Sequence, residues 1–325
     1  MPPKLLLIVL IAVIADFFGL VWEDNSRLPF LETVLQENDS RVSALSFPEK
    51  FVVTKSGKLY ILDTELSKVF YSANGLSLET RCRREIPKYI SDFSVDAKGN
   101  IWTMSASSKK ITGFDPQCKT LASFSLNEDP LRLETNSFGE LILLSGTGND
   151  LFRIYSPNGK LLRSFGERRL YNDKIKNFEL SDGRIVADRK GGFFFSFNYP
   201  PLIRHYANNG SLIDEFEVPL NVKILPPKIT AEKQGNRLAV TSIYQVGVLD
   251  MAIDSQNRLY LLISGQNKAQ ALTYGCRKLM VMSSKGKVLN EYSLDNSFHS
   301  LSLSSNAIYL LRKRDGIELS KYSIP

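Results

Sequence analysis

Short runs of alternating apolar and polar residues, separated by small polar turns, recur along this chain. The clearest are residues 51–62 (FVVTKSGKLYIL), 93–104 (FSVDAKGNIWTM) and 251–262 (MAIDSQNRLYLL). Alternation with a period of two is typical of β-strands, and the Gly or Asn between the two halves tolerates the positive φ that tight turns require. The pattern therefore predicts a series of β-hairpins. Three further segments match it more loosely: 133–144, 178–187 and 301–311.

The predicted turn residues are spaced at intervals that suit one repeated structural unit. Their separations along the chain are 42, 40, 44, 74 and 49 residues. A four-stranded propeller blade takes about 40–45 residues, so the short spacings predict one blade each and the longest predicts a blade with an insertion. The turn residues are Gly57, Gly99, Gly139, Gly183, Asn257 and Asn306.

A second hairpin follows the first in each unit, most clearly at 151–166, 202–218 and 278–294. Each unit is thus expected to hold four antiparallel strands, named a to d from the centre outward. The last unit has only three, and we expect the stretch from Pro29 to Leu35 to supply the fourth and close the ring. No helical stripe of ten residues follows residue 22. A sandwich would not repeat at this period, so the prediction is an all-β, six-bladed β-propeller over residues 23–325.

The first 22 residues have a different character. Residues 5–22 are almost continuously apolar and follow Lys4, which is typical of a signal peptide with a cleavage site after Ala15. The alternative is an uncleaved membrane anchor, in which Asp16 near the middle would cost about 2.5–3.5 kcal/mol. We favour cleavage and therefore expect export, either secreted or periplasmic. Contact with a membrane is expected only through this segment, if it is retained.

Two segments carry a family resemblance. FSVDAKGNIW (93–102) and FRIYSPNGKLLRSFG (152–166) resemble the blades of the NHL-repeat family of six-bladed propellers, and the similarity extends over most of 45–325. This resemblance implies the fold. It leaves the function open, because related propellers include scaffolds, receptors, lyases and lactone hydrolases.

The longest predicted insertions fall on one face of such a propeller. They are the b-to-c segment of blade four (188–201), the d-to-a connection at 221–245 and the b-to-c segment of blade five (264–277). Long loops on a rigid scaffold often carry function. The first contains a cluster of aromatic residues that suggests a partner-binding loop: Phe193, Phe194, Phe195, Phe197 and Tyr199.

A second candidate site follows from the strand register. Seven residues before each predicted turn residue, near the start of each inner strand, stands an ionisable side chain. In a propeller these positions would form a ring at the channel mouth, which could clamp a charged ligand or tie neighbouring blades together by ion pairs. The six residues are Lys50, Asp92, Arg132, Lys176, Asp250 and His299.

Composition narrows the function further. The formal charge is +7, but the basic residues are scattered and have no interleaved aromatics, so no nucleic-acid partner is expected. The two histidines and three cysteines (Cys82, Cys118 and Cys276) form no metal motif and allow at most one intrachain disulfide. We predict no metal, no cofactor and no catalytic set.

The sequence therefore favours an exported, monomeric and non-catalytic propeller that binds a protein, peptide or glycan through its insertion-rich face. The alternative is a propeller hydrolase or lyase with a funnel site around Asp92, Asp250 and His299. A lactone hydrolase of this fold would need a calcium site, and here the two aspartates would have basic neighbours.

Overall fold

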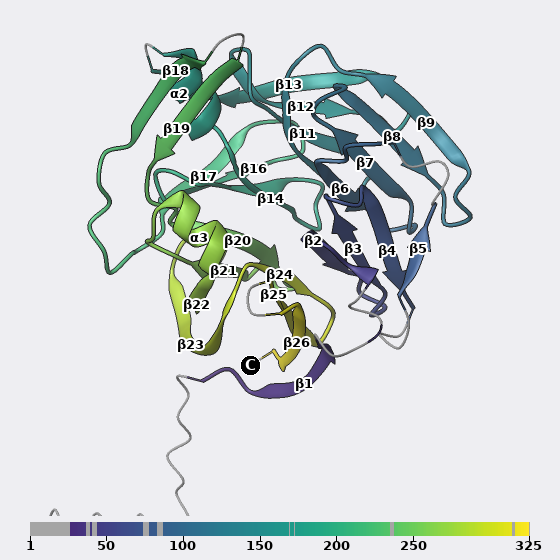
Figure 1. Cartoon of the computed structure of the whole chain (residues 1–325), viewed down its shortest axis with the longest axis vertical. Helices are drawn as coiled ribbons and strands as arrows, with labels where there is room; N and C mark the ends of the chain where they lie inside the picture. Colours follow the sequence, from purple (N-terminus) through teal and green to yellow (C-terminus); the bar gives the residue numbers. More distant parts are fainter. Residues whose placement is uncertain are drawn as a thin grey trace, which may run out of the picture.

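Six four-stranded antiparallel sheets surround a central axis in the computed structural model (Figure 1). The structure describes residues 27–324 except 37–39, 41–43, 74–77, 83–86, 169, 172, 235–236 and 314–315. The predicted all-β, six-bladed propeller is confirmed. The apolar segment at residues 5–22 lies outside the described residues, so its role as signal or anchor stays a prediction.

Each blade is a meander whose strands follow in chain order from the axis outward. Blade one contains β2 (Pro48–Val53), β3 (Leu59–Asp63), β4 (Lys68–Ser72) and β5 (Glu79–Arg81). Blade two contains β6 (Asp92–Val95), β7 (Ile101–Ser105), β8 (Lys110–Phe114) and β9 (Thr120–Ser125). Blade three contains β10 (Pro130–Thr135), β11 (Leu141–Ser145), β12 (Asp150–Tyr155) and β13 (Leu161–Glu167).

The second half of the chain repeats this plan. Blade four contains β14 (Gly183–Ala187), β15 (Phe193–Phe197), β16 (Leu202–Tyr206) and β17 (Leu212–Glu217). Blade five contains β20 (Val248–Ile253), β21 (Leu259–Ile263), β22 (Cys276–Met282) and β23 (Val288–Phe298). Blade six contains β24 (Ser300–Leu303), β25 (Ala307–Arg312), β26 (Glu318–Ser323) and, from the other end of the chain, β1 (Phe30–Leu35).

The ring closes through β1, as expected for the stretch from Pro29 to Leu35. β1 pairs antiparallel with β26, with Phe30 opposite Tyr322 and Leu35 opposite Leu319. This pairing covers the outer edge of β26, which would otherwise expose unpaired backbone groups. The two ends of the described chain are thereby held in one sheet.

Three connections around blades four and five carry additional elements. They contain α2 (Lys174–Leu180), the hairpin of β18 (Lys228–Gln234) and β19 (Arg237–Ile243), and α3 (Lys268–Tyr274). The first two lie in d-to-a connections and the third in a b-to-c connection. Antiparallel strands alternate in direction, so all three connections lie on the face where the inner strands begin.

The predicted register of blade four is wrong. Residues 178–187 do not form a hairpin, because α2 occupies residues up to Leu180 and the inner strand β14 starts at Gly183. Asp173 caps α2 by accepting hydrogen bonds from the backbone N–H groups of Ile175 and Lys176. The a-to-b turn comes later, at residues 188–192, where Gly191 has a φ of +84°.

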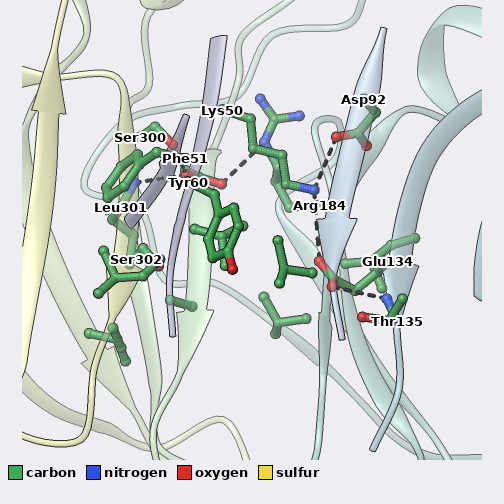
Figure 2. Close-up of a pocket in the computed structure, with 18 of the residues that line it drawn as sticks. Lys50, Phe51, Tyr60, Asp92, Glu134, Thr135, Arg184, Ser300, Leu301 and Ser302 are labelled. Atoms are coloured by element: carbon green, nitrogen blue, oxygen red, sulfur yellow. Dashed lines mark hydrogen bonds and ion pairs between the residues drawn. The ribbon is translucent and has the colours of Figure 1, made fainter. Parts of the chain in front are cut away.

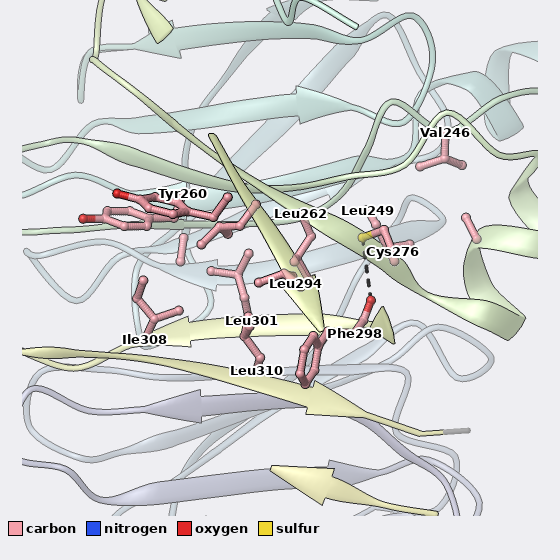
Figure 3. Close-up of a cluster of buried hydrophobic side chains, with 14 of the residues drawn as sticks. Val246, Leu249, Tyr260, Leu262, Cys276, Leu294, Phe298, Leu301, Ile308 and Leu310 are labelled. Carbon is pink, nitrogen blue, oxygen red and sulfur yellow. Dashed lines mark hydrogen bonds between the residues drawn. The ribbon is translucent and has the colours of Figure 1, made fainter. Parts of the chain in front are cut away.

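Hydrophobic side chains pack chiefly between neighbouring blades. The second strands are almost completely apolar and buried, as in β11 and β21. One cluster fills the interface between blades five and six with Tyr260, Leu262 and Leu310 (Figure 3). A single blade could not bury both of its faces, so the core exists only in the ring.

A repeated contact joins the outer edges of successive blades. An aromatic side chain on strand d lies against a glycine in the c-to-d turn of the next blade. A Cβ added at Gly159 would lie 2.7 Å from the Phe124 ring, and one at Gly286 would lie 2.6 Å from Phe216. The seam between blades one and two differs, because Cys118 occupies this turn position and forms a disulfide with Cys82. A covalent bond there takes the place of aromatic packing.

Candidate binding site at the channel mouth

The six inner strands line a central cavity of about 610 Å³. Its lining includes residues from every blade, from the starts of the inner strands to the a-to-b turns of blades one and two. Charged side chains surround the end where the inner strands begin, here called the mouth. Partly buried apolar residues such as Val52, Val95 and Val186 line the section below. Figure 2 shows part of this wall. The cavity can therefore accept a ligand that carries both charged and apolar groups.

The structure brings five of the six predicted mouth residues together. Lys50, Asp92, Arg132, Asp250 and His299 all line the cavity. Lys176 does not, because it lies in α2. Arg184 of β14 takes the equivalent position and lines the cavity. It precedes Gly191 by seven residues, so the same rule would have found it had the turn in DRKGG been recognised.

An ion-pair network joins blades one, two and three at the mouth. The Lys50 Nζ lies 3.0 Å from an Asp92 carboxylate oxygen and 3.8 Å from one of Glu134. Asp92 also accepts a hydrogen bond of 2.9 Å from the backbone N–H of Leu133. Burial by itself lowers the pKa of Lys50, but the two carboxylates outweigh it and raise that pKa. Lys50 therefore stays charged in its partly buried position.

A second bridge joins blades four, five and six. The Arg184 Nε lies 3.4 Å from an Asp250 oxygen. The other oxygen of Asp250 accepts hydrogen bonds from the Ser300 hydroxyl at 2.7 Å and the Leu301 N–H at 2.8 Å. Asp250 thus ties blade five to blade six. Among the described residues, Arg184 forms one ion pair with a carboxylate, the long contact with Asp250.

Arg132 and Glu49 complete the charged mouth, each with one opposite partner. Arg132 donates two hydrogen bonds to the Asp182 carboxylate in a bidentate contact, at 2.8 and 3.0 Å. Burial raises the pKa of Asp182, but Arg132, Arg184 and Lys268 together outweigh it and the net pKa is lowered. Glu49 pairs with Lys313 at 3.1 Å, and its pKa is likewise lowered by that cation against the effect of burial.

Both ring nitrogens of His299 are engaged in structural contacts. Nε2 lies 3.2 Å from the carbonyl oxygen of Thr273, and Nδ1 accepts a hydrogen bond of 3.3 Å from the Lys313 N–H. This arrangement requires the tautomer protonated on Nε2. Burial, together with the charge of Lys313, lowers the pKa of His299. The ring is held neutral and has no nitrogen directed at the cavity for proton transfer.

The mouth carboxylates do not fit a calcium site. Calcium takes six to eight oxygen ligands, whereas Asp92 is paired with Lys50 and Asp250 with Arg184. Within the part of the chain that the structure describes, no group of three or more His, Cys, Asp or Glu is placed to hold a metal ion.

The predicted aromatic partner loop does not exist as a loop. The residues from Phe193 to Phe197 form β15, the buried second strand of blade four, and Phe193, Phe194, Phe195 and Phe197 are each at most 2% exposed. Phe152 of blade three packs edge-to-face on Phe195, with ring centroids 5.1 Å apart. Tyr199 is half-buried and meets Tyr244 at 6.1 Å. These aromatics are core, because every residue of a propeller's second strand faces another strand or blade.

The true insertions pack into one unit beside the mouth, here called the cap. It consists of the described residues within 168–182, 218–247 and 264–275. Lys268 of α3 lies 2.9 Å from Glu179 of α2 and 5.4 Å from the centroid of the Tyr244 ring. Leu272 of α3 also lines the cavity. The surface of the cap includes six exposed apolar side chains: Leu170, Val222, Leu225, Val240, Ile243 and Leu272.

Comparisons with known proteins support the fold. Virginiamycin B lyase from Staphylococcus aureus is 15% identical, with a TM-score of 0.54 over 89% of this chain and 98% of that chain. A gluconolactonase from Xanthomonas campestris is 11% identical, with a TM-score of 0.57 over 91% and 99%. The Swd1 propeller domain of Myceliophteria thermophila is 9% identical, with a TM-score of 0.51 over 90% and 99%.

At these identities the similarity concerns the fold alone. No protein-family model matches the sequence, and no curated protein matches it either. No helix among the described residues is long and apolar enough to cross a membrane.

Proposed function

We propose that this protein is an exported, non-catalytic propeller that binds a protein, peptide or glycan through the face formed by the cap and the channel mouth. The observation that carries the proposal is the continuity of these two features. Leu272 belongs to the cap, lines the cavity and is 48% exposed. A partner resting on the apolar cap can therefore extend a charged group into the mouth.

Arg184 is the mouth cation best suited to contact such a group. Arginine carries five N–H donors, and Arg184 uses them in the pair with Asp250 and in a hydrogen bond of 3.3 Å to the carbonyl of Gly183. Its side chain is 19% exposed, at the cavity wall. Lys50 and Arg132 are held more firmly by their carboxylates.

Export is supported by two independent features. The apolar run at residues 5–22 has the composition of a signal segment. The Cys82–Cys118 disulfide is the kind of bond that persists in oxidising compartments.

The test is a peptide-library and glycan-array screen with the purified protein, followed by two variants with matched exposure. Leu272→Asp places a charge on the cap, and Leu121→Asp places one on outer strand β9, where the side chain is also 48% exposed. We expect Leu272→Asp to weaken binding of the selected ligand at least tenfold and Leu121→Asp to change it less than twofold. Equal affinities for the two variants would reject the cap and mouth as the binding face.

A hydrolase or lyase with a funnel site is the second candidate, since enzymes of both kinds share this fold. Both ring nitrogens of His299 are occupied by backbone contacts, which disfavours a role for this residue as an acid or base. Turnover of an ester, lactone or cyclic peptide that Asp250→Asn or His299→Gln abolishes, with the variant still folded, would favour this candidate instead.

A further inference from the structure

The face opposite the mouth carries most of the protein's excess positive charge. This turn face consists of the a-to-b and c-to-d turns of the blades, at residues 54–58, 96–100, 115–119, 136–140, 156–160, 188–192, 207–211, 254–258, 283–287 and 304–306. These turns contain ten Lys or Arg and five Asp or Glu, an excess of five, whereas the whole chain has an excess of seven. The charge is thus concentrated on one side of the molecule.

The cations on the turn face are exposed. Nine of the ten are exposed to solvent, and Arg258 is the exception. The exposed cations of the a-to-b turns are Lys55, Lys58, Lys98, Arg189 and Lys190. Those of the c-to-d turns are Lys119, Lys160, Lys285 and Lys287. Lys285 is 71% exposed and has Asp214 at 3.3 Å.

The acids of the same turns are recessed and engaged. Four are aspartates at the first turn position that accept backbone hydrogen bonds two and four residues ahead. Asp96 accepts from Lys98 and Asn100, and Asp254 accepts from Gln256 and Arg258. The fifth, Glu140, is paired with Arg163 at 2.5 Å. In the turns Asp96-Ala97-Lys98 and Asp188-Arg189-Lys190, the carboxylate is therefore engaged by the backbone while the lysine is exposed.

Apolar side chains surround this basic face at its rim. The first residues of the outer strands, directly after the c-to-d turns, are exposed leucines and an isoleucine. They are between 40% and 51% exposed: Leu121, Leu161, Leu162, Leu212, Ile213 and Leu289. In blade six the same position belongs to the start of β1, where Phe30 is 54% and Leu31 51% exposed. Exposed apolar groups beside lysines are typical of surfaces that rest on lipid headgroups.

The direction of β1 adds a third observation. Phe30 pairs with Tyr322 at the end of strand c, so β1 begins at the turn face and runs toward the mouth face. The exposed side chains of Phe30 and Leu31 at the start of β1 therefore lie beside the basic turn face.

We propose that the turn face docks on an anionic phospholipid membrane, which directs the mouth and cap away from the bilayer. Lysines attract the anionic headgroups and the rim side chains enter the interface, and peripheral binding strengthens with both buried apolar area and electrostatic attraction. An acidic polysaccharide would be attracted by the lysines alone and gives no role to the exposed rim. This docking does not depend on the ligand that the mouth accepts.

The test measures sedimentation of the full chain with phosphatidylcholine vesicles, with and without phosphatidylglycerol. The turn-face variant is Lys55→Gln, Lys98→Gln and Lys285→Gln. The control is Lys174→Gln, Lys223→Gln and Arg277→Gln, which removes the same charge from exposed residues on the mouth side. Any binding through the apolar N-terminal run is common to both variants, so the phosphatidylglycerol-dependent increase is the quantity compared.

Each lysine near an anionic surface contributes a factor of about five to partitioning. We expect the turn-face variant to lose about a hundredfold of that increase and the control less than threefold. The increase should also shrink at high salt. Equal losses in the two variants, or no dependence on phosphatidylglycerol, would overturn the proposal. Lysine-dependent binding to a polyuronate without lipid dependence would assign the face to an acidic polysaccharide instead.

Discussion

Individual side chains at the mouth act first as bridges between blades. The side chain of Asp92 is 3% exposed and contacts Lys50 of blade one and the backbone of blade three. Asp250 serves blades five and six in the same way. A buried carboxylate needs several donors to offset its desolvation, and these positions provide them. The mouth residues can therefore both join blades and contact a ligand. The shortest ion pair of Arg184 measures 3.4 Å, which is longer than the shortest ion pair of Lys50 or of Arg132.

His299 gives this structural role a pH dependence. Its pKa is lowered from 6.5 by burial, so below about that pH the unfolded chain binds more protons than the folded one, and the free energy of unfolding falls. His299→Gln cannot titrate. Between about pH 7.5 and about pH 5.5 we expect the wild type to lose about 1 kcal/mol more stability than this variant.

The measurement is urea unfolding at the two pH values. His205→Gln, which removes the other histidine, should retain the loss that depends on His299. Parallel pH profiles for wild type and His299→Gln would show that the ring is not held neutral.

At the scale of elements, the cap is assembled by a few polar contacts between segments distant in sequence. Tyr244, just after β19, donates a hydrogen bond of 3.3 Å to the carbonyl of Glu179 in α2. Ile229 and Leu180 belong to the same buried cluster as Tyr244. The helices are only seven residues long, too short to persist alone in water, so packing within the cap stabilises them.

Lys268→Met tests this assembly. The change removes the ion pair with Glu179 and the contact with Tyr244, and we expect faster amide exchange in α2 and α3 with a global loss of about 1 kcal/mol. Hydrogen exchange followed by mass spectrometry measures both. Lys278→Met, which removes a pair with Glu291 inside blade five, should leave exchange in the cap unchanged. Equal exchange in α2 for the wild type and Lys268→Met would mean that apolar packing alone holds the cap.

At the scale of the whole molecule, stability depends on every seam of a closed ring. Aromatic-on-glycine packing joins the outer edges from blade two to blade five, and the Cys82–Cys118 disulfide joins blades one and two. Arg81 stands opposite Val69, where blades two to five place an aromatic ring, and stacks on Tyr71 at 4.0 Å. At this seam the disulfide therefore takes the place of the aromatic-on-glycine packing.

Removing the disulfide should weaken that seam strongly. For Cys82→Ser with Cys118→Ser we expect a loss of about 3–4 kcal/mol in the free energy of unfolding, the value for a closed loop of this length. Denaturant unfolding measures it. A reducing agent should bring the wild type to the level of the variant and leave the variant unchanged. A loss below about 1 kcal/mol would mean that local packing, not the cross-link, secures the seam.

The sequence by itself determined the fold class and most of the mouth. Strand alternation and turn glycines are local properties, written within about ten residues, and they located five of the six ring positions. These local patterns gave the wrong register in blade four. There α2 precedes the inner strand, and the aromatic run forms the buried second strand instead of the predicted exposed loop. Whether Phe195 is exposed depends on Phe152, which lies in another blade.

Only the tertiary structure decided which residues meet across blades. The pairing of Cys82 with Cys118, the contacts of His299 and the assembly of the cap all join residues far apart in sequence. The separation of a basic turn face from the mouth face also appears only when the strands alternate in direction around the ring. A one-dimensional pattern specifies periods and turns, whereas contacts between repeats depend on how the ring closes in space.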